Sequence, residues 1–255
     1  MGDVIGFFLD PAHWQGATGI PNRLLEHFVI SGAAILAATI IAIPIGLYIG
    51  HTNRGAGLAI NLANIGRAVP SYAMMVIPLP FTLALAPVLG YSPTFGLTFL
   101  PIFLAMTFLA IPPLLVSTYA GLRSVDRDLI EAGRGMGMRE RQILGRIELP
   151  LASSIVVGGF RTATLQVIAT ATIGAILAGG GLGRFIFDGL NQGPAGRSSI
   201  YAGAILVSGL AIGVDALLSR VQRRLTPRAL RQTLTGGTGR WTVDMPDRVE
   251  PAAAA

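Results

Sequence analysis

The chain of 255 residues is 52% apolar and only 13% charged, carries a formal net charge of +6 and contains no cysteine. Soluble domains average roughly 25% charged residues, so this composition excludes an ordinary soluble enzyme and is typical of a membrane protein. The absence of cysteine excludes disulfides and thiolate metal sites. All of the basic residues are arginine, which excludes lysine Schiff-base chemistry and a P-loop in this chain.

Residues 1–27 are predicted to form an extracytoplasmic or interfacial segment. Trp14 lies in this segment, and an aromatic ring suits the headgroup layer of a membrane. The segment has no basic region ahead of an early apolar run and no small-residue cleavage site, so a cleaved signal peptide is not expected.

Apolar segments of about 20 residues, the length that crosses a bilayer, recur along the chain. They are residues 28–50, 58–80, 97–119, 151–178 and 200–218. Pro70 interrupts the second of these. Residues 74–90 leave three possibilities open: the end of the second span, a re-entrant segment or a short additional span. We take the simpler count of about five spans.

Arginine placement predicts the orientation, because cytoplasmic loops of membrane proteins are enriched in positive charge. The loop 121–150 and the tail 221–255 are arginine-rich, and two spans separate them. Both are therefore expected to be cytoplasmic, with the tail disordered. The predicted fold is all-α: a polytopic transmembrane helical bundle of about five spans, N-out and C-in, with residues 28–220 as the transmembrane domain.

The loop between spans three and four is too polar to span a membrane and is predicted to form a compact helix-turn-helix. Ser124 or Asp126 can cap the start of its first helix. Gly133 and Gly137 are four residues apart and are expected to share one face of that helix. Gly135 and Gly137 also weaken the helix, so a turn is predicted before a second short helix at residues 139–147.

Leu149 and Pro150 are expected to end this unit, because a residue before proline avoids helical backbone angles. The predicted knob has a smooth face of small residues and a fringe of arginines, a shape that can insert into a groove of another protein. A solvated charged loop is the alternative, although such a loop would not need glycines at this spacing.

The same loop carries a motif. It resembles the EAA-x3-G-x9-I-x-LP motif of binding-protein-dependent ABC importer permeases, and its third residue is glycine where the motif has alanine. The matching positions, which the resemblance implies contact the ATPase, are Glu131, Ala132, Gly133, Gly137, Ile147, Leu149 and Pro150.

Further stretches are similar to the osmoprotectant branch of these permeases, which import glycine betaine, choline, carnitine or proline betaine. They are residues 64–72, 131–138, 161–164 and 179–183. Methionine-type permeases share similar glycine-rich stretches, so an importer of methionine or another small solute is the nearest alternative.

The resemblance implies a transport subunit rather than an enzyme, in the plasma or inner membrane of a prokaryote. In such families the knob is a coupling helix seated in a cytoplasmic ABC ATPase, which binds ATP and Mg. This chain would hold no cofactor or metal of its own. The implied partners are that ATPase, an extracytoplasmic substrate-binding protein, a second permease that is identical or related, and membrane lipid; nucleic acid is not expected.

Polar residues inside the spans are candidates for the translocation path, because they are costly in lipid and usually face a cavity. Thr162, Gln166 and Thr170 recur at four-residue spacing on the fourth span, and Pro70 and Ser71 mark the break in the second. Helix–helix packing is the alternative for both groups.

Arg161 and Asp215 are both predicted to lie in the cytoplasmic half of the membrane, where they can form an ion pair. Snorkelling of each side chain to the interface is the alternative. A stand-alone secondary transporter, the competing class, would need an intramembrane carboxylate near the midplane. Only Asp215 offers one, and it lies near a span end.

Overall fold

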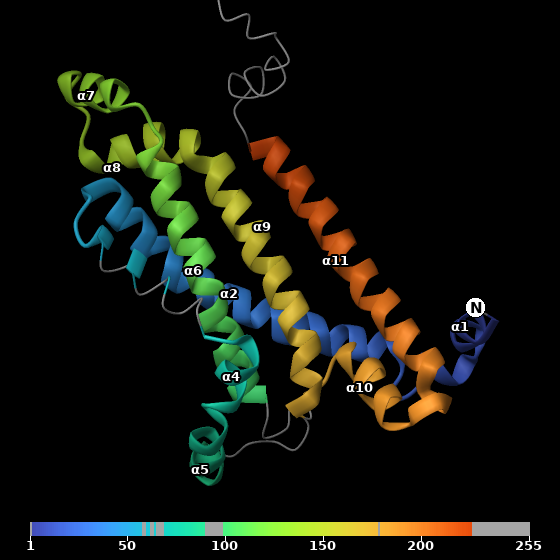
Figure 1. Cartoon of the computed structure of the whole chain (residues 1–255). Coiled ribbons are helices and arrows are strands. Elements are labelled where there is room, and N and C mark those ends of the chain that lie inside the picture. The colour runs from blue at the N-terminus through green and yellow to red at the C-terminus, as the bar shows by residue number, and fades with distance from the viewer. Residues whose placement is uncertain are drawn as a thin grey trace, which may run out of the picture.

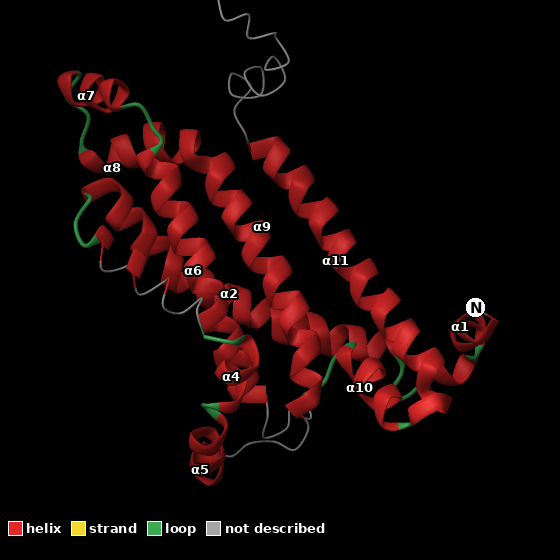
Figure 2. Cartoon of the chain, viewed as in Figure 1, coloured by secondary structure: helices red, strands yellow, loops and turns green. Residues whose placement is uncertain are grey.

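The structure, a computed structural model, describes residues 2–57, 60–61, 64, 69–89, 99–177 and 179–225, and in these ranges it consists of helices joined by loops and turns (Figures 1 and 2). Within these ranges, four helical runs are long and apolar enough to cross a bilayer. Their main helices are α2 (Ile20–Thr52), α6 (Phe99–Arg123), α9 (Leu149–Gly174) and α11 (Arg197–Leu225). The predicted all-α class is confirmed.

Shorter helices connect and flank these four. They are α1 (Gly2–Leu9), η1 (Pro11–Trp14), α4 (Ser71–Val76), α5 (Leu79–Leu89), α7 (Arg127–Gly135), α8 (Glu140–Ile143), η2 (Leu144–Glu148), η3 (Ala175–Leu177), α10 (Gly183–Asn191) and η4 (Gly193–Gly196).

Two predicted boundaries differ from the structure. Helix α2 begins at Ile20 rather than at residue 28, because Gly19 is extended and Pro21 occupies the first helical turn, where proline is favoured. The predicted second span, residues 58–80, lies partly outside the described residues. In its described part, α4 ends at Val76 and a turn separates it from α5. The predicted cytoplasmic tail lies outside the described residues beyond Leu225.

Small residues let the long helices approach closely, as is typical of membrane bundles. A Cβ at Gly46 of α2 would lie 2.7 Å from the Cβ of Thr118 on α6. A Cβ at Gly159 of α9 would overlap the side chain of Ser117, also on α6. Alanines fill much of the core among these three helices: Ala34, Ala38, Ala42, Ala105, Ala110, Ala163 and Ala171. The bundle is thus built on α2, α6 and α9.

The bundle has two distinct ends (Figure 1). At the first, the α7 end, the start of α9 meets the end of α11: the Ser153 hydroxyl donates to the Leu225 carbonyl at 3.2 Å, and the Gln222 amide donates to the Ser154 carbonyl at 2.9 Å. At the second, the α10 end, α10 lies beside α11 and near α1. The arginine-rich loop 121–150 and the arginines that end α11 therefore lie at the same end.

Candidate coupling site

Helix α7 begins at a side-chain cap. Asp126 is its N-cap residue, and one carboxylate oxygen accepts the backbone N–H of Asp128 at 3.0 Å. Of the two predicted caps, Asp126 is therefore the one that the structure uses. Ser124 instead donates to the Gly121 carbonyl at 2.8 Å, at the end of α6.

The end of α7 is closed by Gly137. The N–H of Met138 donates to the Gly133 carbonyl at 3.1 Å, and the N–H of Gly137 donates to the Arg134 carbonyl at 2.9 Å. This pair of bonds is the Schellman motif, which needs a left-handed residue, and Gly137 has φ +80°. The expectation that Gly133 and Gly137 share one helical face is wrong, because Gly137 lies beyond the helix.

Gly133 faces inward rather than toward a docking partner. It is buried, and a Cβ placed on it would lie 2.9 Å from Cδ1 of Ile147 and 3.6 Å from Cγ1 of Ile143. The glycine that replaces the motif's alanine therefore lets α7 pack closely against the chain that leads into α9. Two positions of the motif, Gly133 and Ile147, thus contact each other.

Leu149 and Pro150 do not end the helical unit, contrary to the prediction. Leu149 has helical backbone angles (φ −64°, ψ −44°), and its N–H donates to the Leu144 carbonyl, five residues back. This π-helical turn, η2, joins α8 to α9, so the predicted second short helix is continuous with the fourth span. Pro150 is the second residue of α9, directly after this π-helical turn.

Three residues that motif spacing did not single out lie together beside α7. His51, at the end of α2, places Nδ1 2.6 Å from Glu148 and Nε2 3.2 Å from Glu140. Arg134 of α7 binds Glu140 with two hydrogen bonds of 2.9 and 3.2 Å, and this bonding raises the pKa of the Arg134 guanidinium. The separation of 97 residues between His51 and Glu148 hides this cluster from any local pattern.

The outer surface of α7 and its turn combines apolar and charged groups. Met136 is 74% exposed and Leu129 is 48% exposed. Glu131 and Ala132, the first two positions of the motif, are exposed as well. Such apolar residues are costly to leave in water, so this surface is suited to contact with another protein.

Arg161 and Asp215 form an ion pair between α9 and α11. The guanidinium binds both carboxylate oxygens, at 2.5 and 2.7 Å. Two parallel hydrogen bonds of this kind orient both side chains. The structure therefore has these two residues bonded to each other rather than extended separately.

The candidate path residues differ in burial. Along α9, Thr162 is exposed, Gln166 is half-buried and Thr170 is buried, so the three do not lie on one exposed surface. Pro70 is the N-cap residue of α4, with Ser71 as its first residue, and its carbonyl accepts the Met74 N–H at 3.1 Å. The break at Pro70 therefore begins a short helix.

At the α10 end, the glycine-rich stretch 179–183 is held by α2. A carboxylate oxygen of Glu26 accepts the Gly181 N–H at 2.8 Å and the guanidinium of Arg23 at 2.9 Å. Gly181 has φ +91°, and a Cβ there would lie 3.1 Å from the His27 ring. The glycines thus allow the loop to lie directly on α2.

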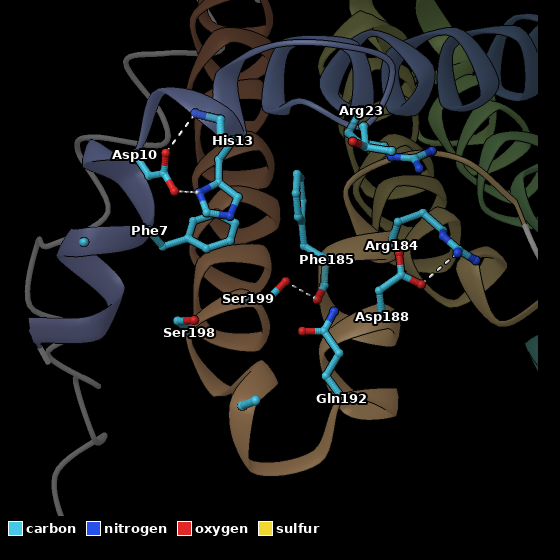
Figure 3. Close-up of a pocket in the computed structure, with 14 residues that line it drawn as sticks. Phe7, Asp10, His13, Arg23, Arg184, Phe185, Asp188, Gln192, Ser198 and Ser199 are labelled. Atoms are coloured by element: carbon cyan, nitrogen blue, oxygen red, sulfur yellow. Dashed lines mark hydrogen bonds and ion pairs between the residues drawn. The ribbon is translucent and has the colours of Figure 1, made fainter.

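A cavity of about 430 Å³ opens at the same end (Figure 3). Asp10 and His13 lie on one side of it, and Arg184 and Asp188 lie on the other, with Phe185 between them. Arg184 and Asp188 pair at 2.7 Å, and the His13 ring is within 3.7 Å of Asp10. The charged groups of this cavity thus face partners within the chain.

These features define a class of protein: a helical membrane permease that presents a short helix-turn-helix outside its spans. The family model of the binding-protein-dependent transport system inner membrane component matches residues 42–227, and the chain belongs to this family. It is therefore a permease subunit of an ABC transporter in the inner membrane, not itself catalytic. Permeases of this family carry no cofactor, and ATP binds to the ATPase partner.

Several curated relatives are similar over most of the chain. The carnitine transport permease protein OpuCB of Listeria monocytogenes is 33% identical over 93% of this chain and 100% of its own length. OpuCD of the same species, also a carnitine transport permease, is 39% identical over 82% of this chain and 87% of its own length. The osmoprotectant import permease OsmW of Salmonella typhimurium is 31% identical over 90% and 100%.

Solved structures show the same fold at lower identity. An inward-facing form of the MetNI methionine ABC transporter matches with a TM-score of 0.70 and 21% identity, over 86% of this chain and 99% of the matched chain. An amino acid ABC transporter solved with histidines matches with a TM-score of 0.60 and 16% identity, over 80% and 93%. At these identities the match establishes the fold alone.

Proposed function

We propose that this chain forms the membrane path of an ABC importer for compatible solutes: glycine betaine, choline, carnitine or proline betaine. The observation that carries the proposal is the identity of 31% to 39% with osmoprotectant permeases over at least 82% of the chain. The MetNI likeness gives no comparable support to methionine, because it is a likeness of fold.

The proposed topology has five spans, with the N-terminus outside and the C-terminus inside. Helices α2, α6, α9 and α11 supply four spans, and residues 58–80 supply the second in order on the basis of their hydropathy. The positive-inside rule supports this orientation, since the arginine-rich segments 121–150 and 220–224 belong to one end of the bundle. The α10 end then faces outward.

Helix α7 and the turn at Gly137 are the proposed contact with the ATPase. Exposed Leu129, Ala132 and Met136 would enter an apolar groove, and Glu131 would make an ionic contact at its edge. Met136→Asp tests this surface, because it would place a charge in the groove. We expect weaker association with the ATPase for Met136→Asp and unchanged association for Leu190→Asp, a control at the opposite end that is 61% exposed.

The remaining partners follow from the same topology. The substrate-binding protein would dock at the α10 end, around the cavity lined by Asp10 and Arg184. A second permease, identical or related, would complete the path. Helix α11 offers a suitable surface, since Ile205 and Ile212 are 53% and 69% exposed. Pro70, Ser71, Thr162, Gln166 and Thr170 are the candidate residues of the path, and its selectivity would be weak.

Uptake in cells tests the substrate class. Cells without other importers of these solutes are grown at high osmolarity, and uptake of labelled glycine betaine and choline is measured with and without this chain. We expect saturable uptake that disappears on deletion and returns with the wild-type chain. Unchanged uptake on deletion, or uptake of methionine alone, would contradict the proposal.

A further inference from the structure

The end of α2 holds a histidine between two carboxylates that belong to another part of the chain. Nδ1 of His51 lies 2.6 Å from Glu148, and Nε2 lies 3.2 Å from Glu140. The side chain of His51 is 14% exposed and that of Glu148 is 4% exposed. The contact with Glu148 is therefore largely shielded from water, which strengthens a charged interaction.

The two contacts, one at each ring nitrogen, suit the imidazolium form of His51. An ionised carboxylate only accepts hydrogen bonds, and a neutral imidazole donates from only one of its two nitrogens. Both contacts are hydrogen bonds only when His51 is the imidazolium and donates from both nitrogens. One positive charge then lies between two negative charges. Arg134 adds a second positive charge beyond Glu140, so the four groups alternate in sign.

These four charged side chains lie on helices that have different roles in the proposed mechanism. His51 ends α2, Glu148 lies in the π-helical turn that leads into α9, and Glu140 and Arg134 lie on α8 and α7. A cavity of about 70 Å³ is lined by His51 and Glu148 and, from α7, by Arg127, Ile130, Glu131 and Arg134. The end of α2 is thus connected to α8 by charged contacts, and the cavity lies next to them.

We propose that His51 is a positioning residue for energy coupling: as an imidazolium, it binds the segment α7–α8 to the end of α2. A movement that the ATPase imposes on α7 then moves α2 with it. This proposal rests on the proposed role of α7 as the ATPase contact. Without the charge on His51, α7 and α8 would move while α2 lagged behind, and ATP would be hydrolysed with less transport.

The test compares a neutral variant with a permanently charged one. The permease, its ATPase and its binding protein are reconstituted together in vesicles, and glycine betaine uptake and ATP hydrolysis are measured. We expect His51→Gln to transport about tenfold less per ATP. We expect His51→Arg, which can donate to both carboxylates, to keep the coupling. Arg54→Gln, which removes an exposed positive charge three residues after His51, is the control.

A distance measurement covers the case in which a variant folds poorly. The chain has no cysteine, so spin labels at Thr52→Cys and Gly135→Cys, where a Cβ meets open space, report the separation of α2 and α7 with no other labelled site in this chain. The expected result is one narrow distance in the wild type during turnover and a broad distribution in His51→Gln. Wild-type coupling and a narrow distance in His51→Gln would overturn this proposal. A wild-type complex that transports no compatible solute would instead overturn the proposed function.

Discussion

Gly137 offers a sharp test of how the loop 121–150 is built. It closes α7 in the left-handed region at φ +80°, and no atom lies within 4 Å of a Cβ placed on it. A side chain therefore meets backbone strain alone, about 1–2 kcal/mol for an ordinary residue. That energy corresponds to a roughly fivefold to thirtyfold fall in the ratio of the native turn to other conformations of the loop. Asparagine is close to leucine in size but tolerates the left-handed region.

The assay is association of the purified permease with its ATPase, compared for Gly137→Leu and Gly137→Asn. We expect Gly137→Leu to weaken association by about fivefold to thirtyfold and to abolish most transport. Gly137→Asn should stay near the wild type, because it keeps the Schellman turn. An equal loss in both variants would refute this reasoning and would show that bulk at the docking surface, rather than the backbone angle, is what matters.

Two further variants test the packing of the spans. Gly159→Val should separate α6 from α9, because its side chain would overlap Ser117. We expect a loss of about 1–3 kcal/mol in stability, measured as a lower midpoint of thermal unfolding. The control Gly213→Ala, with open space around its Cβ, should leave the midpoint unchanged. Asp215→Asn should lower transport by breaking the ion pair with Arg161, whose Nε atom lies 2.5 Å from the carboxylate. The double variant Arg161→Asp with Asp215→Arg should restore part of the lost transport. Transport by the double variant no better than by either single variant would argue against the pair.

The helical class and the four long apolar helices of the described residues could be predicted from the sequence because hydropathy acts over whole segments. A run such as 97–119 leaves little choice in a bilayer, and α6 occupies nearly the same residues. The first residue of α2 was harder to predict from the sequence, because Arg23 and Glu26 reduce the hydropathy of its first turns. In the structure these two side chains bind each other, which allows the helix to begin at Ile20.

The motif predicted where the loop lies but not the structural role of each of its residues. Spacing along an ideal helix placed Gly133 and Gly137 on one face, but Gly137 lies in the turn that the glycines at 135 and 137 also predicted. Proline after Leu149 suggested a break, but a π-helical turn keeps the helix continuous. The contact of His51 with Glu148 joins segments that no local pattern relates. Tertiary packing decides all three.

The most direct test of the central claim is ATP-driven accumulation of a compatible solute by the reconstituted complex. Vesicles containing the permease and its ATPase are supplied with the binding protein, labelled glycine betaine or choline, and ATP inside or outside as orientation requires. We predict accumulation that needs both ATP and the binding protein and is lost with Gly137→Leu. Accumulation driven by an ion gradient without ATP, or movement of methionine but of no compatible solute, would contradict it.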